Sequence, residues 1–295
     1  MLAFPYFYLD GLSLSDVVFN THYLPDGVRH AAMHVVSPNT QLHFCHENEI
    51  LGSGGGIWNA RFHLQWDKTF AVANGDAVVT FAEPDTLEQM LRFHQSQKAL
   101  ATLLLCPLEG IGTRVPGVWV DKYDHVARFG KDIRDPNLEC LHYASFMLCS
   151  DELWKRLPSG SSNILYDVLE PAIREGERVV GFRMLSMRWF ETGNSNDYLA
   201  ATRECLEMLR ENSRLGRPLR QMLDRFAPNY TASSELDRLR LIDDSAEIDS
   251  SADIRGFSVV GAQAKIGPGV VLENCVVLPG AVVGPGQTLA NQTLI

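Results

Sequence analysis

The C-terminal segment, residues 246–295, repeats with a period of six, and this period restricts the fold more than any other feature of the chain. One set of positions, six residues apart, holds mostly large aliphatic side chains: Ile248, Ile254, Val260, Ile266, Leu272, Leu278, Gly284 and Ala290. A second set of buried type follows each by four residues: Ala252, Ser258, Ala264, Val270, Val276, Val282, Thr288 and Leu294. An α-helix repeats every ~3.6 residues and a strand every ~2, so neither keeps a strict six. A parallel β-helix does, because each hexapeptide forms one side of a coil and stacks on the coil below.

Composition excludes several classes of function. The formal net charge of −10 disfavours nucleic acid and anionic lipid as main partners. No apolar run approaches the ~20 residues that span a bilayer, and the N-terminus lacks the basic region of a signal peptide. The six cysteines have no paired spacing, so they are predicted to be small core residues in a reducing compartment. We therefore expect a cytoplasmic protein without a membrane partner.

The first two thirds of the chain alternate strand-like and helix-like segments. Short apolar runs bounded by polar, Gly or Pro residues, as in buried parallel strands, cover residues 15–21, 41–47, 69–76 and 100–108. Between the last two, residues 83–99 have apolar residues at helical spacing, with Asp85 or Thr86 near the N-cap. This succession predicts a βαβ unit and a Rossmann-like α/β fold, a mixed sheet flanked by helices.

Residues 117–193 contain further strand-like runs with few long helices between them, and we expect them to add antiparallel strands to one end of the sheet. A helix capped by Ser195 is expected to close this domain near residue 212. Residues 213–245 are charged and contain two prolines, and we expect a helical connector there. The predicted division is therefore an α/β domain at 1–212, a connector at 213–245 and a β-helix at 246–295.

Four glycines stand within the five positions 52–56, directly after the strand predicted at 41–47 and before a helix-like run. A glycine run at a strand-to-helix turn exposes backbone N–H groups beside a helix N-terminus, which favours binding of an anion or a nucleobase. Packing explains the same run equally well, if the loop needs unusual backbone dihedrals. The residues alone leave both interpretations open.

Two acidic residues stand where strands are predicted to end. Asp76 closes the run Asn-Gly-Asp, and at the carboxyl end of a strand it can hold Mg²⁺ together with phosphate oxygens. Glu191 precedes a glycine turn and a helix, and with Asp76 it can form a two-carboxylate metal site. The alternatives are an Asx turn at Asp76 and a surface glutamate at Glu191. Lys131 can neutralise a phosphate, although a solvated lysine explains it as well.

Six segments, in this order and at this spacing, resemble the sugar-phosphate nucleotidyltransferases of the mannose-1-phosphate guanylyltransferase and N-acetylmuramate-1-phosphate uridylyltransferase type. They are DVVFNTHYLPDGV (16–28), HENEILGSGGGIWNA (46–60), FAVANGD (70–76), ALATLLL (99–105), NILYDVLEPAIREGERVVGF (163–182) and WFETGNSNDYLAA (189–201). The C-terminal repeat is similar to the left-handed β-helix that many members carry. Several motifs in order make the resemblance specific for the family and unspecific for the base and the sugar.

The resemblance implies a reaction in which a sugar 1-phosphate attacks the α-phosphorus of a nucleoside triphosphate, giving a nucleotide sugar and pyrophosphate with the help of Mg²⁺. It implies nucleotide-binding roles for Glu47, Gly52, Ser53, Gly54, Gly55, Gly56, Asn74 and Gly75. It implies sugar-side roles for Ser145, Asn163 and Asp167, a metal-binding role for Asp76 and Glu191, and catalytic roles for Asp76 and Lys131. Glu191 stands where the family usually has aspartate, and Ser145 where glycine is common.

The family opens with a strand and a GxGTR loop followed by Pro-Lys, which cradles the triphosphate, and no such loop precedes Gly52 in this sequence. We expect either that the natural chain begins further upstream, or that this is an inactive relative that binds a nucleotide or nucleotide sugar as a regulatory or scaffold protein. We further expect a homo-oligomer formed through the β-helix, because the open ends of its coils need covering.

Overall fold

The structure of the chain is a computed structural model that describes residues 1–64, 68–235 and 238–295. The chain divides into two compact units. The first, here the α/β unit, comprises residues 2–75 and 83–187. The second, here the β-helix unit, comprises Met1 and residues 76–82 and 188–295. The segment 76–82 therefore leaves the α/β unit and returns to it.

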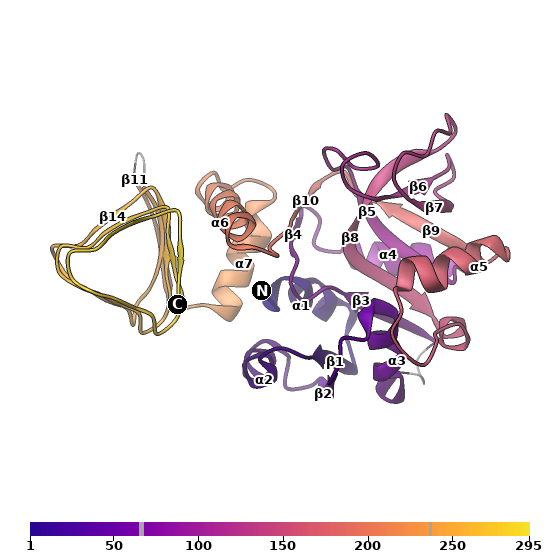
Figure 1. Ribbon diagram of the computed structural model, residues 1–295, viewed down its shortest axis with the longest axis horizontal. Coiled ribbons are helices and arrows are strands. Elements are labelled where there is room, and N and C mark those ends of the chain that lie inside the picture. The colour runs from indigo at the N-terminus through magenta and orange to yellow at the C-terminus, as the bar shows by residue number, and fades with distance from the viewer. Residues whose placement is uncertain (65–67, 236–237) are drawn as a thin grey trace. The chain divides into compact units, whose positions relative to one another are not determined.

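The α/β unit begins with alternating helices and strands and continues with several strands in succession (Figure 1). Its helices are α1 (Ala3–Leu9), η1 (Asp10–Leu12), α2 (Pro25–Val35), α3 (Gly52–Leu64), α4 (Thr86–Gln97), η2 (Asp151–Lys155), η3 (Ile164–Leu169) and α5 (Glu170–Arg174). Its strands are β1 (Asp16–Thr21), β2 (Gln41–His46), β3 (Thr69–Ala73), β5 (Ala101–Cys106), β6 (Gly117–Val120), β7 (Val126–Gly130), β8 (Glu139–Ser150) and β9 (Val179–Arg183). The strands and the helix predicted in the first hundred residues are present, each with slightly different bounds.

The main sheet has the order β7-β6-β8-β5-β9, and β3 pairs with β8 beside β6. β5 is parallel to β9 and antiparallel to β8, so the sheet is mixed, which confirms the predicted fold class. The expectation that the strands after residue 117 only extend one end of the sheet is wrong for β8, which lies in its middle. The reason is its length: one edge of its twelve residues pairs with β5, and the other pairs first with β6 and then with β3.

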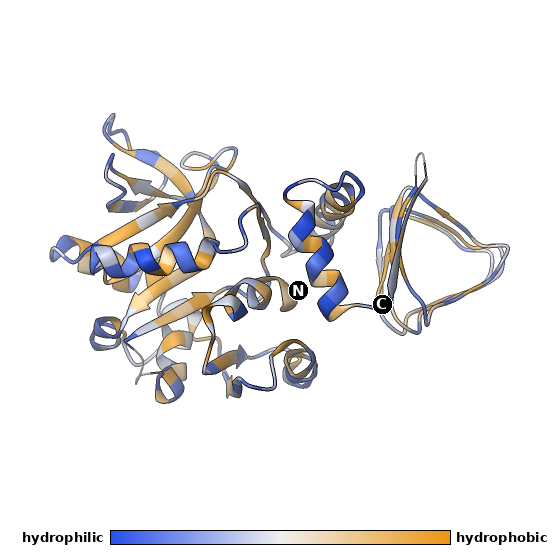
Figure 2. Cartoon of the chain, turned by 180° about the vertical axis from the view of Figure 1, so that it is seen from behind, coloured by the Kyte–Doolittle hydropathy of each residue, from blue (hydrophilic) through white to orange (hydrophobic). Residues whose placement is uncertain are grey.

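The core of the α/β unit lies against this sheet. Every residue of β5 is buried, as the continuous apolar run Ala-Thr-Leu-Leu-Leu-Cys predicts. Figure 2 shows the strands of the sheet coloured mainly as hydrophobic. β1 and β2 form a separate parallel pair in register from Asp16 and Gln41 to Thr21 and His46. Helix α3 follows β2 and packs against both strands, which places the glycine run beside the end of β1.

The β-helix unit begins with two helices, α6 (Ser195–Arg210) and α7 (Gly216–Phe226), and a two-stranded sheet of β4 (Val78–Phe81) and β10 (Met187–Phe190). All four residues of β4 are buried, and this strand was not predicted separately from the sequence. Asn194, rather than the predicted Ser195, caps α6 by accepting hydrogen bonds from the next turn. The segment expected as a helical connector, 213–245, contains α7 and then the antiparallel hairpin of β11 (Tyr230–Glu235) and β12 (Arg238–Asp243); residues 236 and 237 lie outside those described.

The C-terminal repeat forms stacked three-sided coils, seen end-on as triangles in Figure 1. The short strands are β13 (Glu247–Ile248), β14 (Asp253–Arg255), β15 (Phe257–Val260), β16 (Lys265–Ile266), β17 (Val271–Glu273), β18 (Val276–Val277), β19 (Val282–Val283), β20 (Thr288–Ala290) and β21 (Thr293–Leu294). They fall into three parallel sheets, β12-β15-β18-β21 with β11 at its edge, β13-β16-β19 and β14-β17-β20. The predicted parallel β-helix is therefore present.

The predicted unbroken period of six is wrong beyond Leu272. Ile254 pairs with Leu272, eighteen positions on, but Val260 pairs with Val277 and Ile266 with Val283, seventeen positions on. The inward positions consequently move one residue back, from Leu278, Gly284 and Ala290 to Val277, Val283 and Leu289. The second set moves likewise, from Val282 to Ala281: Val282 is 70% exposed, whereas Ala281 is 6% exposed.

The slip arises at one corner of the coils. Arg255 and Val259 are separated by three residues, whereas their partners Glu273 and Val276 are separated by two. The shorter corner turns at Asn274, whose φ of 54° is left-handed, a conformation that asparagine tolerates better than most residues. Cys275 then takes the inward place held by Ser258 one coil below, and its N–H donates to the Ser258 hydroxyl at 3.3 Å. A shortened corner thus keeps the buried column continuous.

Two further expectations concern membrane-spanning helices and the cysteines. Among the described helices, none is long and apolar enough to cross a membrane. The six cysteines all carry free thiols. Cys106, Cys149 and Cys275 are buried, as predicted for core cysteines, whereas Cys45, Cys140 and Cys205 are only partly buried.

Candidate functional site

The glycine run is not a turn before a helix, as predicted, but the first turn and a half of α3 itself. Gly52 enters it with a left-handed φ of 71°, which favours glycine. The N–H groups of Gly54 and Gly55 donate to the carbonyl oxygen of Ser162 at 2.8 and 3.4 Å. These two amides are therefore paired within the chain, whereas the ligand interpretation of the sequence assumed that they were bare.

Close packing accounts for three of the glycines. A β-carbon on Gly54 would lie 2.5 Å from the Ser162 hydroxyl oxygen, and one on Gly55 would lie 2.4 Å from the carbonyl oxygen of Gly160. A β-carbon on Gly56 would lie 2.3 Å from the side-chain nitrogen of Asn20. All three distances are below any normal contact. At Gly55 the atom met is backbone, so a side chain there would force α3 and the loop at Gly160 apart, whereas at Gly54 and Gly56 the side chains of Ser162 and Asn20 would have to turn away. The packing interpretation thus has direct support.

The structure brings the predicted nucleotide side and sugar side together within the α/β unit. The Ser53 hydroxyl accepts a hydrogen bond from the N–H of Ile164 at 3.0 Å, and the N–H of Ser162 donates to the Leu51 carbonyl at 2.9 Å. Ser162 is 7% exposed, and no hydrogen-bond partner for its hydroxyl oxygen is found in the described chain. Sequence reasoning missed Ser162, although its small, polar neighbours Ser159, Gly160 and Ser161 mark a loop that can approach a backbone closely.

Asn163 and Asp167 cap the π-helical turn η3. The Asn163 side-chain oxygen accepts from the N–H groups of Leu165 and Tyr166 at 2.9 and 3.2 Å, and the Asp167 carboxylate accepts from the Asn163 N–H at 2.7 Å. This reciprocal pairing is an N-terminal cap. It holds the segment after Ser162 in place, so the sugar-side residues have a structural role here.

Glu47 stands at the entry to the glycine run. It is 8% exposed, and its carboxylate accepts a hydrogen bond from the N–H of Leu51 at 3.0 Å. Its own N–H donates to the carbonyl of Thr21 at 2.8 Å, which extends the β1–β2 ladder by one bond. Glu47 thus closes the loop 47–51 and orients the start of α3.

Asn74 and Ser145 also lie side by side. The N–H of Asn74 donates to the carbonyl of Ser145 at 3.1 Å, directly after the paired residues Ala73 and Phe146. Ser145 has a φ of 70° in a bulged part of β8, which is the conformation that glycine adopts most easily. A serine held in this conformation carries some backbone strain that a glycine would avoid, and glycine is common at this position in the family that the sequence resembles.

Asp76 and Glu191 are close in the β-helix unit. Asp76 lies two residues before β4 and Glu191 directly after β10, the two strands that pair. The hydroxyl of Thr192 donates a short hydrogen bond to the backbone carbonyl of Asp76. Glu191 accepts, through one carboxylate oxygen, the N–H groups of Thr192 and Gly193 at 3.1 and 3.2 Å. In the described part of the chain, the exposed carboxylate of Asp76 has no hydrogen-bond or ion-pair partner.

This donor set fits Mg²⁺ in kind, because carboxylate oxygens are the ligands this ion takes in proteins. Across the described ranges, no group of three or more His, Cys, Asp or Glu side chains is arranged to hold a metal ion. A site built from Asp76 and Glu191 would consequently need phosphate oxygens and water to complete the coordination shell. The two carboxylates would hold the ion only in the presence of substrate, or weakly.

Lys131 lies elsewhere in the α/β unit, directly after β7. Its ammonium donates to the backbone carbonyl of Arg114 at 2.6 Å, and the N–H of Asp132 donates to the carbonyl of Gly112 at 2.8 Å. The loop 110–114, which resembles a phosphate loop in sequence, is thus tied to the end of β7. An ammonium has three N–H donors, so Lys131 keeps donors for a ligand.

Over most of its length the chain shares its fold with two solved structures. Inositol-1-phosphate CTP transferase from T. maritima superimposes with a TM-score of 0.56 at 14% sequence identity, covering 77% of this chain and 84% of that one. HddC from Yersinia pseudotuberculosis, complexed with GMP-PN, superimposes with a TM-score of 0.52 at 18% identity, covering 68% and 83%.

Sequence comparison points to the same class. Mannose-1-phosphate guanylyltransferase from Mycobacterium tuberculosis is 26% identical over 235 residues, which is 79% of this chain. The chain spans only 58% of the length of that relative. No protein-family profile matches the chain. Together these similarities support a relationship to the sugar-phosphate nucleotidyltransferases.

Proposed function

We propose that this chain transfers a nucleotidyl group from a nucleoside triphosphate to a sugar 1-phosphate, giving a nucleotide sugar and pyrophosphate. The observation that supports this most directly is the similarity to a mannose-1-phosphate guanylyltransferase over 79% of the chain. The fold shared with a CTP transferase acting on inositol 1-phosphate supports the same type of reaction. Catalysis of this kind needs mainly positioning and charge neutralisation.

In this proposal different residues bind the metal ion, the phosphate of the sugar and the nucleoside. Asp76 and Glu191 hold Mg²⁺, and the ion supplies charge neutralisation at the phosphates of the triphosphate. Lys131 donates hydrogen bonds to the phosphate of the sugar substrate. Gly52 and Ser53 contact the nucleoside, and Glu47 orients them from behind. The role falls to these two residues because the N–H groups of the next two glycines already donate to the Ser162 carbonyl.

The test is pyrophosphate release by the purified chain, with each of the four common nucleoside triphosphates, a panel of sugar 1-phosphates and Mg²⁺. We expect Asp76→Asn to lower the rate at least ~100-fold, the scale of losing a pre-organised charge contact. The control is Asp224→Asn, which alters an exposed aspartate on α7. Unchanged turnover in Asp76→Asn contradicts the metal-binding role.

Nucleotide binding without any pyrophosphate release would contradict the enzymatic proposal and favour a regulatory or scaffold protein. We also propose that the chain self-associates through the β-helix, since the apolar side chain of Val282 on its coils is 70% exposed. Multi-angle light scattering measures this, and a monomer at micromolar concentration would contradict it.

A further inference from the structure

The hairpin of β6 and β7 ends in the residue proposed to contact the sugar phosphate. β7 runs to Gly130, and Lys131 follows it directly. The indole N–H of Trp119 on β6 donates to the carbonyl of Gly130 at 3.0 Å, so the last peptide before Lys131 is bonded to the other strand. The position of Lys131 therefore depends on how firmly the hairpin is held to the rest of the sheet, together with the bond from its ammonium to the Arg114 carbonyl.

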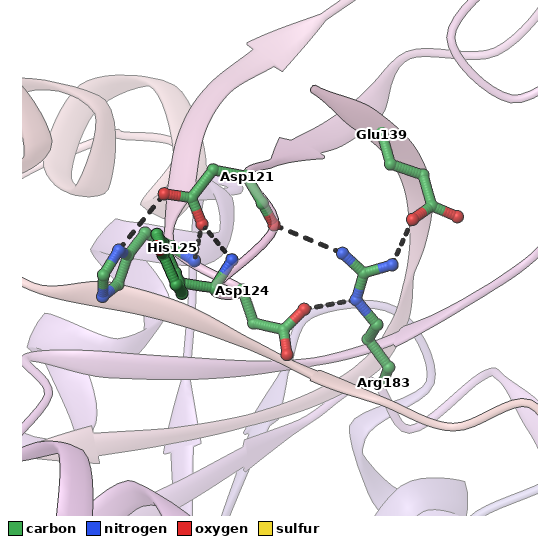
Figure 3. A network of polar contacts seen from close by, with 6 residues as sticks. Asp121, Asp124, His125, Glu139 and Arg183 are labelled. Carbon is green, nitrogen blue, oxygen red and sulfur yellow. Dashed lines mark hydrogen bonds and ion pairs between the residues drawn. The ribbon is translucent and has the colours of Figure 1, made fainter. Parts of the chain in front are cut away.

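Arg183, the last residue of β9, holds the turn of this hairpin from outside it (Figure 3). Its guanidinium donates short hydrogen bonds to the carboxylate of Asp124 in the turn and to that of Glu139 on β8. A third, at 3.3 Å, reaches the backbone carbonyl of Asp121. One side chain thus joins β9, β8 and the turn 121–125.

The turn is also stiffened from within. One carboxylate oxygen of Asp121 accepts the N–H groups of Tyr123 and His125 at 2.8 and 2.9 Å, and Asp124 has a left-handed φ of 67°. The carbonyl of Asp124 accepts the N–H of Gly181 on β9 at 2.8 Å. These bonds join the residues of the turn to one another and to β9, so a contact made to Asp124 acts on the turn from which both strands of the hairpin leave.

The charges keep this arrangement in place. Burial opposes the charged guanidinium, but the hydrogen bonds that it donates to Asp124 and Glu139 more than offset this and raise the pKa of Arg183 above its ordinary value. The Arg183 side chain is 27% exposed, so water screens these contacts less than it screens an ordinary surface ion pair. Arginine suits the position because its planar fork reaches two carboxylates at once.

We propose that Arg183 is a positioning residue that fixes the β6–β7 hairpin and, through it, the Lys131 ammonium. This inference rests on the proposed function, in which Lys131 contacts the phosphate of the sugar 1-phosphate. Arg183 itself touches neither substrate nor metal. Its effect is on the geometry of the transition state, where a misplacement of ~1 Å is enough to cost up to ~100-fold in rate.

The experiment compares the wild-type chain with Arg183→Gln in two measurements. We expect kcat to fall at least ~10-fold while the KM for the nucleoside triphosphate changes less than ~2-fold, because the hairpin does not carry the nucleoside side of the site. We also expect amide hydrogen exchange in residues 117–131 to become at least ~10-fold faster, with α4 and β5 unchanged. Arg128→Gln is the matched control, since Arg128 lies exposed on β7 and has no ion pair with another described residue.

Unchanged exchange in residues 117–131, or faster exchange with an unchanged kcat, would overturn the inference. If Arg183→Gln does not fold, Glu139→Gln removes one partner only and is expected to shift both readouts in the same direction by a smaller factor. A wild-type chain without nucleotidyl transfer would overturn the proposed function and the role of Lys131. The exchange rates would then still decide whether Arg183 holds the hairpin.

Discussion

Replacing Gly55 by alanine separates the two explanations of the glycine run. Gly55 has an ordinary helical backbone within α3, so on helix propensity alone alanine would stabilise the chain by about 1 kcal/mol. The new β-carbon would, however, lie 2.4 Å from the Gly160 carbonyl oxygen and 2.8 Å from the β-carbon of Leu51. Overpacking of this kind costs about 1–3 kcal/mol.

Relief of the clash moves the loop that carries Ser162, and so weakens hydrogen bonds of about 1 kcal/mol each. Two link Ser162 to Gly54 and Gly55, and a third links it to Leu51. After subtracting the gain in propensity, we expect a net loss of about 2 kcal/mol. Calorimetry should then show the α/β unit melting roughly 4–8 °C lower.

The matched control is Gly11→Ala, where no atom lies within 4 Å of the new β-carbon. We expect it to change stability by less than about 0.5 kcal/mol. The measurement is made without nucleotide, so a ligand contact has no part in the result. If Gly55→Ala is as stable as the wild type or more so, the packing argument is wrong, and ligand binding becomes the better explanation of the glycine run.

Two further predictions concern the β-helix and the response to acid. Val283→Asp should unfold the β-helix or lower its melting temperature by well over 10 °C, because it buries a charge. Val282→Asp should change the free energy of unfolding by less than about 1 kcal/mol, because this side chain is exposed. If Val282→Asp were the more destabilising variant, the period of six would be unbroken and the slip at Asn274 would be wrong. Burial lowers the pKa of His94 to about 4, and its ring bonds the Thr102 hydroxyl at 2.8 Å. The pKa of His94 is lower in the folded chain than in the unfolded chain, so its contribution to the free energy of unfolding is complete above about pH 6.5. This contribution is lost as the pH falls towards 4, which lowers the free energy of unfolding by about 2–3 kcal/mol. His94→Gln should therefore flatten urea-denaturation midpoints measured from pH 7 to pH 4.5, and an unchanged slope would contradict this.

The sequence was sufficient for the features that depend on local periodicity. The buried strand β5 follows from a continuous apolar run, and the amphipathic helix α4 follows from a period of about 3.6, since both patterns lie within the segment itself. The three-sided coils follow from the hexapeptide period for the same reason. The predicted residues Ser53, Asn163 and Asp167 were chosen from motifs, and the structure brings their segments into contact.

Tertiary structure alone decided the features that depend on partners distant in sequence. The central position of β8 needs three neighbours, β5, β6 and β3, none of which its own residues specify. The occupied amides of Gly54 and Gly55 depend on Ser162, more than a hundred residues away, and a glycine run looks the same whether its neighbour is a ligand or a carbonyl. The slip at Asn274 is decided by which residues stack across coils, because a corner can lose one residue while both flanking sides keep their apolar pattern. Periodicity specifies a face, but only packing specifies what lies against it.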